Sequence, residues 1–111
     1  MKLSPDFHIK HYKDSIYRGE LVNRMRHGLG ICYYENNRVY EGSWDQDKRH
    51  GPGYERFSNG NTYLGEYVTG HVHGKGLYRW ITGDSYDGEW VKGVKHGYGV
   101  WKGCSGDSYI G

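Results

Sequence analysis

The sequence repeats with a constant period of 23 residues, and this period constrains the fold more than any other feature. Tyrosines recur at this spacing, as do glycines two positions after them and His-Gly pairs ten positions after them. The tyrosines are Tyr17, Tyr40, Tyr63, Tyr86 and Tyr109, and the histidines of the pairs are His27, His50, His73 and His96. A constant period of this length indicates an array of structural units, each packed against its neighbours.

The period divides the chain into four complete repeats. We predict them at residues 17–39, 40–62, 63–85 and 86–108, and a fifth repeat begins at Tyr109. Residues 1–16 are expected to supply a capping strand from a degenerate repeat, because the end units of repeat arrays are usually atypical. The incomplete fifth repeat suggests either a fragment of a longer protein or a chain that dimerises at this edge.

Each repeat is predicted to form one β-hairpin. In "SYDGEWV", Tyr86, Gly88 and Trp90 alternate along the chain and therefore share one face of a strand. A glycine between two aromatic residues allows a ring to lie flat over the backbone. The segment "HGYGVWK" is expected to be the second strand of the same hairpin.

Glycines mark the predicted turns. Gly70 and Gly93 stand between the two strands of their hairpins, where a left-handed conformation is expected. Arg24 and Asp47 hold the equivalent positions, so the first two turns are expected to differ. Pro52 lacks a ladder donor, so its strand is expected to start late or to bulge there. Left-handed residues are also expected between hairpins, at Asn37, Gly60, Gly83 and Gly106.

The composition predicts a thin, aromatic-rich β structure. Only 35% of the residues are hydrophobic, whereas the chain holds 19 glycines and 12 tyrosines. Nine strands at ~4.8 Å would give a sheet roughly 43 Å long, and no sequence remains for helices or a second layer. The expected fold is all-β: an elongated, single-layer antiparallel sheet of tandem hairpins, curved into a groove.

Three segments carry a resemblance to a known family. "YEGSW…RHGPG", "YLGEY…VHGKG" and "YDGEW…KHGYG" resemble the MORN (membrane occupation and recognition nexus) repeat, and the likeness extends over residues 17–111. Leu21 departs from it, because it stands where the other repeats have an aromatic residue. The resemblance implies a hairpin array with one grooved face, as in junctophilins, plant phosphatidylinositol phosphate kinases, ciliary radial-spoke proteins and protozoan cytoskeletal scaffolds. It implies tethering and assembly roles through protein binding, self-association or lipid binding.

Two sets of residues are assigned from alternation within the repeat. The first set is expected to hold the array together: Tyr40, Gly42, Trp44, Tyr63, Gly65, Tyr67, Tyr86, Gly88, Trp90, Gly97 and Gly99. The second set lies on the second strands with the parity of the paired glycines, where missing side chains would open a floor for a peptide or helix. Its members are Tyr34, Phe57, Tyr78 and Trp80.

Charge leaves one alternative open. The net charge is +2, which predicts no nucleic-acid binding. The basic residues concentrate in residues 1–39, where Arg18, Arg24 and Arg26 are candidates for contact with anionic phospholipids or phosphoinositides. The sequence thus favours a non-catalytic scaffold that binds a protein partner, with homo-oligomers as a further expectation. The alternatives are a membrane-attachment module and the regulatory repeat region of a phosphatidylinositol phosphate kinase.

The sequence predicts no enzyme, metal or cofactor. Successive His-Gly histidines would stand about 9.6 Å apart, too far to share one ion, and are expected to satisfy turn hydrogen bonds. The Gly-x-Gly pairs are never completed as a nucleotide-binding fingerprint. Cys32 and Cys104, 72 residues apart, are predicted to be free thiols, because a disulfide needs Cα atoms within about 7 Å. Without a signal peptide or an apolar span, the chain is expected to be cytoplasmic, in association with the cytoskeleton or a membrane.

Overall fold

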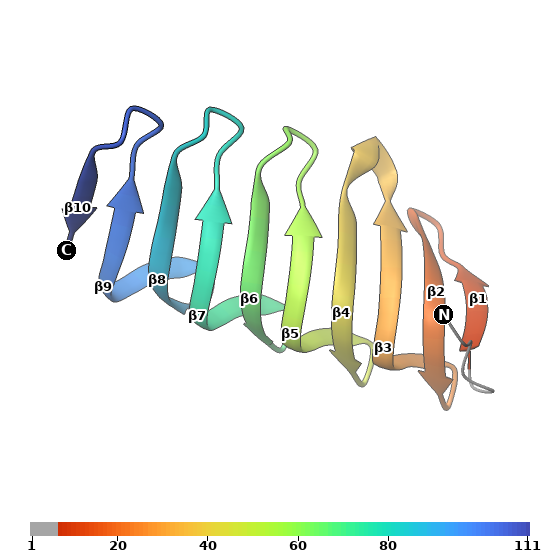
Figure 1. Ribbon diagram of the computed structural model, residues 1–111. Coiled ribbons are helices and arrows are strands. Elements are labelled where there is room, and N and C mark those ends of the chain that lie inside the picture. The colour runs from red at the N-terminus through yellow and green to blue at the C-terminus, as the bar shows by residue number, and fades with distance from the viewer. Residues whose placement is uncertain (1–6) are drawn as a thin grey trace.

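The computed structural model describes residues 7–111, which form one open antiparallel sheet (Figure 1). The strands are β1 (Phe7–His11), β2 (Ser15–Val22), β3 (Met25–Tyr34), β4 (Val39–Asp45), β5 (Lys48–Arg56), β6 (Thr62–Val68), β7 (His71–Arg79), β8 (Ser85–Val91), β9 (Val94–Lys102) and β10 (Ser108–Ile110). Their order across the sheet is their order in the chain. The predicted all-β, single-layer hairpin array is confirmed.

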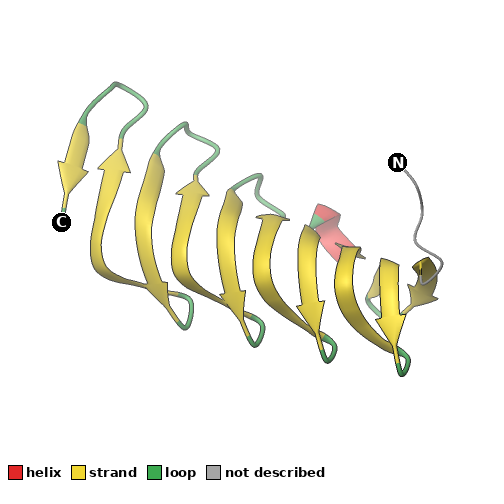
Figure 2. Cartoon of the chain, turned by 60° about the horizontal axis from the view of Figure 1, so that its bottom comes forward, coloured by secondary structure: helices red, strands yellow, loops and turns green. Residues whose placement is uncertain are grey.

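The array differs from the prediction at three places. It has ten strands rather than nine, because Ser108–Ile110 already pairs with β9. A 3₁₀ turn, η1 (Glu35–Asn37), replaces a plain turn between β3 and β4. At the other edge β1 pairs with β2, and residues 1–6 of the expected capping segment lie outside the described residues. The molecule measures 46 × 28 × 25 Å, and its strands bend along their length (Figure 2).

A row of glycines crosses the sheet from β2 to β9. Each is the cross-strand partner of the next: Gly19, Gly30, Gly42, Gly53, Gly65, Gly76, Gly88 and Gly99. A tyrosine ring covers each intrahairpin pair, so there is no space for a side chain. A Cβ atom at Gly76 would lie 2.1 Å from the hydroxyl oxygen of Tyr63, and one at Gly65 would lie 2.5 Å from the Cα atom of Gly76.

The His-Gly motif forms a bulge after this row. Within each hairpin, the cross-strand register shifts directly after the row glycine of the first strand. The His-Gly segment of the second strand lies opposite this shift. Gly28, Gly51, Gly74 and Gly97 adopt positive φ angles of 71°, 90°, 77° and 66° in these bulges. Pro52 lies within one of them, but its strand does not start late, and the same bulge occurs in the hairpins without proline.

The two-residue turns within the four hairpins are alike, so the expected difference for the first two turns is wrong. Both turn residues have positive φ in every case, which matches the twist of the flanking strands. Arg24 and Asp47 adopt φ angles of 65° and 71°, close to the 87° and 83° of Gly70 and Gly93. The turns between hairpins follow the prediction, with φ angles of 64°, 94°, 98° and 96° at Asn37, Gly60, Gly83 and Gly106.

Contact between successive hairpins explains why the turns are alike. The backbone N–H groups of Asp47, Gly70 and Gly93 each donate to a carbonyl of the preceding hairpin. The acceptors are the carbonyls of Arg26, Arg49 and Val72, at N···O distances of 2.9, 2.8 and 3.0 Å. A turn of another type would lose this bond, so the tertiary contact overrides the preference of Asp47 for other conformations. The turn at Arg24 belongs to the first hairpin and donates no bond of this series among the described residues.

The core is one continuous ladder of aromatic rings on one side of the sheet, which we call the inner face. The rings meet edge to face, with centroids 5.0–5.8 Å apart and interplanar angles of 84–89°. In spatial order they are Tyr17, Trp44, Tyr40, Tyr67, Tyr63, Trp90 and Tyr86. All are at least nine-tenths buried. Leu21 packs beside the ladder at the N-terminal end without extending it by another ring.

Hydrogen bonds fix the polar atoms of the ladder. The hydroxyl groups of Tyr17, Tyr40 and Tyr63 donate to the carbonyl three residues later, at 2.7–3.1 Å. The Nε1 groups of Trp44 and Trp90 donate to the carbonyls of Gly30 and Gly76 in the preceding hairpin, at 3.2 and 3.1 Å. These five rings are thus tied to backbone at the glycine row or next to it, whereas the Tyr67 hydroxyl donates to the carboxylate of Glu55.

Gly76→Ala should destabilise the array, because the new methyl group would displace the ring of Tyr63. Overpacking of this kind lowers the free energy of unfolding by about 3 kcal/mol. Gly70→Asn is the matched control: nothing lies within 4 Å of the added carbon, and asparagine tolerates positive φ, so a loss of about 1 kcal/mol or less is expected. Urea denaturation measures both. Equal losses would show that the glycine row is not a steric requirement.

The ladder should also make the protein sensitive to alkali. Burial raises the pKa of Tyr63 from 10.0 to about 12, and it raises the pKa of Tyr17, Tyr40 and Tyr67 further. The unfolded chain therefore loses protons first, and the contribution of these tyrosines to stability should be constant below about pH 10 and fall as pH rises towards 12 and beyond. Denaturation at a series of pH values tests this. Tyr63→Phe should reduce the slope, whereas Tyr54→Phe, at a more exposed position, should not.

Candidate functional site

Cationic side chains cover the aromatic ladder in three of the four hairpins. The guanidinium of Arg26 lies 4.5 Å from the centre of the Trp44 ring. Arg49 lies 5.4 Å from the Tyr67 ring, and the ammonium of Lys95 lies 4.9 Å from the Tyr86 ring. The three occupy one repeat position, and the fourth member of the series is Val72. Val72 therefore places no cation over the rings of Tyr63 and Trp90.

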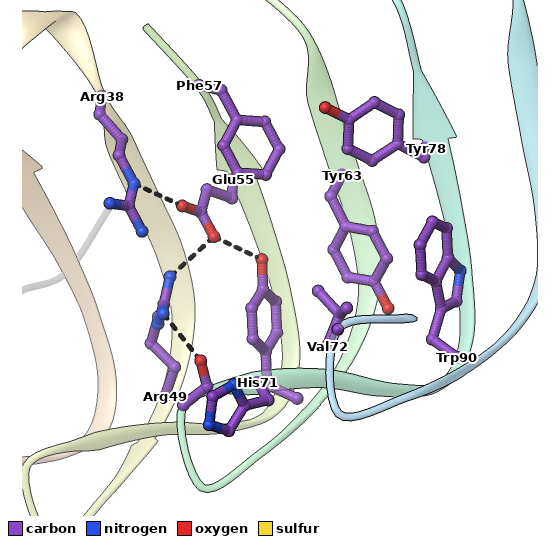
Figure 3. A pocket seen from close by; sticks show the side chains of 12 residues that line it. Arg38, Arg49, Glu55, Phe57, Tyr63, His71, Val72, Tyr78 and Trp90 are labelled. Atoms are coloured by element: carbon purple, nitrogen blue, oxygen red, sulfur yellow. Dashed lines mark hydrogen bonds and ion pairs between the residues drawn. The ribbon is translucent and has the colours of Figure 1, made fainter. Parts of the chain in front are cut away.

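A hollow of about 240 Å³ opens beside Val72 (Figure 3). The ladder rings of Tyr63, Tyr67 and Trp90 line it, together with Val72 and the turn glycines Gly70 and Gly93. One wall is aromatic and the other is charged. The hollow lies on the inner face because its lining includes ladder rings.

The aromatic wall consists of rings from the second strands. Phe57 stacks on Tyr78 with centroids 5.6 Å apart and an interplanar angle of 28°, and the ring of Trp80 also contacts Tyr78, at a centroid distance of 4.8 Å. Asn61 fixes this wall, since its amide donates to the Tyr78 hydroxyl at 3.0 Å and accepts from the backbone N–H of Ile81 at 3.0 Å. The wall is therefore held in place by groups of two successive hairpins.

The charged wall is built around Glu55, whose side chain is 2% exposed. Its carboxylate accepts hydrogen bonds from Arg38 at 2.7 Å, from Arg49 at 2.8 Å and from the Tyr67 hydroxyl at 2.9 Å. Two guanidinium groups and one carboxylate leave this wall with a net charge of +1. The sequence analysis missed Glu55, although a signal existed: the equivalent positions hold Cys32, Tyr78 and Trp101.

The repeats account for most of the chain. The MORN repeat model matches residues 17–37, 40–62, 63–85 and 86–108. The chain belongs to the MORN repeat family. No curated protein sequence matches it. MORN repeats are in general a non-catalytic module, so the array is a repeat scaffold or binding module.

The four predicted groove residues of the MORN array all lie on the inner face, but they do not all reach the hollow. Phe57 and Tyr78 line it, and Trp80 supports Tyr78. Tyr34 lies one hairpin away, 4.9 Å from the Arg38 guanidinium, and burial next to Cys32 raises its pKa to about 12. The aromatic pair at the hollow, Phe57 and Tyr78, thus comes from two hairpins. The charged wall consists of residues that alternation did not single out, namely Arg38, Arg49 and Glu55.

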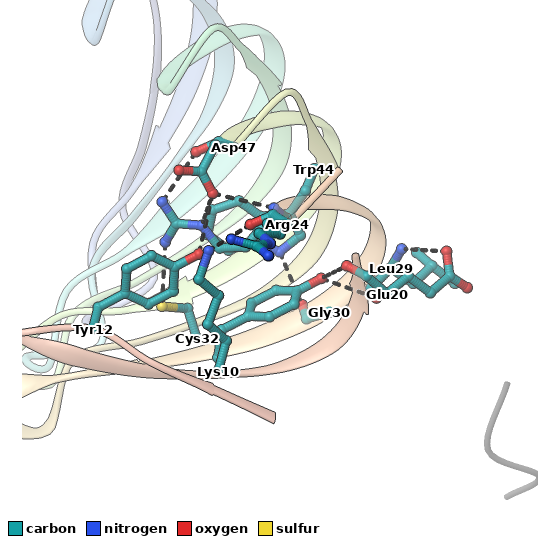
Figure 4. Close-up of polar contacts among 11 residues, drawn as sticks. Lys10, Tyr12, Glu20, Arg24, Leu29, Gly30, Cys32, Trp44 and Asp47 are labelled. Atoms are coloured by element: carbon teal, nitrogen blue, oxygen red, sulfur yellow. Dashed lines mark hydrogen bonds and ion pairs between the residues drawn. The ribbon is translucent and has the colours of Figure 1, made fainter. Parts of the chain in front are cut away.

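The three predicted basic residues of the MORN array do not form one patch. Arg18 follows Tyr17 in β2 and so points to the opposite face, and Arg24 is in a turn. Arg26 is bound on the inner face, where its Nε donates to the carboxylate of Asp47 at 2.6 Å. Figure 4 shows Asp47 among the polar contacts near Tyr12 and Trp44. Burial would raise the pKa of Asp47, but the hydrogen bonds from Arg26 outweigh it and lower this pKa.

The remaining candidates of the sequence analysis occupy structural positions. His50 accepts a hydrogen bond from the backbone N–H of Thr69 at 3.2 Å, a turn contact between two MORN repeats. Cys32 is buried and Cys104 exposed, both as free thiols. Within residues 7–111, no three His, Cys, Asp or Glu side chains are grouped as a metal site. Over the same range, no helix has the length and apolar character to cross a bilayer.

Glu55→Gln should destabilise the MORN array, because Arg38 and Arg49 would lose their shared anionic partner in a buried setting. Hydrogen bonds to charged groups contribute about 1.5–3 kcal/mol, so the free energy of unfolding should fall by about 2 kcal/mol. Glu41→Gln removes the same charge at an exposed position of β4 and should change it by less than about 0.5 kcal/mol. Urea denaturation compares the two. Equal stabilities would mean that Glu55 does not hold the charged wall.

Proposed function

We propose that this MORN array is a non-catalytic scaffold that binds a segment of a partner protein along its inner face. The observation that carries the proposal is the uncovered hollow at Val72. Every other hairpin places a cation over the ladder at this position, whereas here aromatic rings line open space. Phe57 and Tyr78 are half-buried at this hollow, and partly accessible aromatic rings in a concave setting are typical of protein-binding surfaces.

The rigidity of the hollow supports the proposal. Its walls belong to hydrogen-bonded strands, and Glu55, Tyr67, Tyr78 and Asn61 are all fixed by hydrogen bonds. Little side-chain order therefore has to be gained on binding, and more of the contact energy contributes to affinity. An extended segment could follow the inner face across several hairpins, with one side chain inserted into the hollow.

Replacing the aromatic wall should weaken binding without unfolding the array. We would select binders from a displayed library of short random peptides and measure their affinity by fluorescence polarisation. Phe57→Ala and Trp80→Ala should each weaken binding by about tenfold, the usual effect of an aromatic anchor. Tyr54→Ala, a more exposed position on the other face, is the control. The proposal fails if no peptide is selected, or if Phe57→Ala and Trp80→Ala bind as the wild type does.

Liposomes test the alternative of membrane attachment. Co-sedimentation with and without phosphoinositide, at low and at physiological salt, separates a lipid binder from a groove binder, because attraction between exposed charges is screened by salt. Salt-sensitive pelleting that requires phosphoinositide, and that is lost in Arg18→Gln, would favour the membrane module. If the protein does not pellet with liposomes under any of these conditions and the library yields binding peptides, the scaffold is favoured.

A further inference from the structure

We infer that the hollow selects an acidic segment, in which a carboxylate stands next to the apolar side chain that enters between Phe57, Tyr78 and Val72. This inference rests on the proposed function and specifies the chemistry of the partner. It follows from two features of the hollow, its size and its one-sided charge.

The size indicates one side chain rather than a cofactor. Pockets for drug-sized ligands have volumes of about 300–1,000 Å³, and this hollow has about 240 Å³. Aromatic rings and the side chain of Val72 form the apolar part of its lining. Aromatic or branched aliphatic side chains match such a lining.

The charge indicates an anion beside that side chain. Among the lining residues, Arg38 and Arg49 are cationic, and Glu55 is the single acid. Arg49 donates from both of its Nη groups, to Glu55 at 2.8 Å and to the carbonyl of Gly70 at 2.7 Å. Arg38 is 38% exposed and donates only from Nε, and no described residue accepts from its Nη groups. The N–H groups of these two nitrogens therefore remain available, and a pair of them matches the geometry of a carboxylate.

A cationic ligand fits the same rings less well. Aromatic walls can bind a cation through their faces, and a buried acid next to them would strengthen that interaction. Here Glu55 already accepts from two guanidinium groups and a hydroxyl, and the net charge of the wall is +1. A cation in the hollow would meet like charge, which favours anionic over cationic partners.

The sequence itself offers a variant that closes the hollow. Lys95 occupies the position equivalent to Val72 and lies over the rings of Trp80 and Tyr86 within a folded hairpin. Val72→Lys should therefore fold and place its side chain over Tyr63 and Trp90. Leu64→Lys adds the same charge on the opposite face, where Leu64 is 56% exposed, and serves as its control.

The experiment uses the selected peptides of the displayed library. Acidic residues should be enriched next to an aromatic or branched aliphatic residue. Replacing the acid of a selected peptide by its amide should weaken binding to the wild type about tenfold, the effect of losing one charge-assisted contact. Arg38→Gln should bring this ratio close to one, whereas Val72→Lys should weaken both peptides about tenfold or more, unlike Leu64→Lys. Circular dichroism and urea denaturation establish that each variant folds.

The outcomes separate the two claims. Peptides that lose affinity in Val72→Lys but show no preference for acid over amide would overturn the inferred acidic chemistry and leave the groove intact. An acid preference that persists in Arg38→Gln would also overturn it, because the carboxylate would then bind elsewhere. Binding unaffected by Val72→Lys, or the selection of no peptides, would contradict the proposed function as well.

Discussion

The structure depends on the contact between a tyrosine ring and a pair of glycines. The ring lies where two side chains would otherwise stand, and its hydroxyl reaches the backbone three residues later. This contact gives a single-layer sheet a buried core without a second layer, since the ring covers its own hairpin and meets the aromatic residue of the next. The large buried area of aromatic side chains explains how so few hydrophobic residues suffice.

The period predicted the fold because each unit is local. Spacing and alternation identified the hairpins, the inner face and the left-handed turn residues such as Asn37 and Gly60. The prediction failed where neighbouring hairpins interact. The turn at Asp47 departs from residue preference because its backbone N–H bonds to the preceding hairpin, and Pro52 lies in a bulge common to all four hairpins.

The candidate site was only partly predictable for the same reason. Alternation placed Phe57 and Tyr78 on the inner face, but the hollow exists because Val72 interrupts a series of cations. Nothing in the local pattern of Val72 distinguishes it from an ordinary strand valine. The repeat pattern singles out Glu55 only as an acid where other repeats have Cys32, Tyr78 and Trp101. Its role depends on its ion pairs with Arg38, which precedes β4, and with Arg49 of its own strand.

The series formed by Arg26, Arg49, Val72 and Lys95 has a consequence for how such arrays diverge. Because the ladder continues unbroken beneath all four side chains, the residue at this position can change without rebuilding the core. Exchanging one more cation for a short apolar side chain would leave a second stretch of the ladder without a cation, one unit or about 9.6 Å along the sheet for adjacent repeats. On the proposed function, single substitutions would thus add binding positions at a spacing set by the backbone of the array.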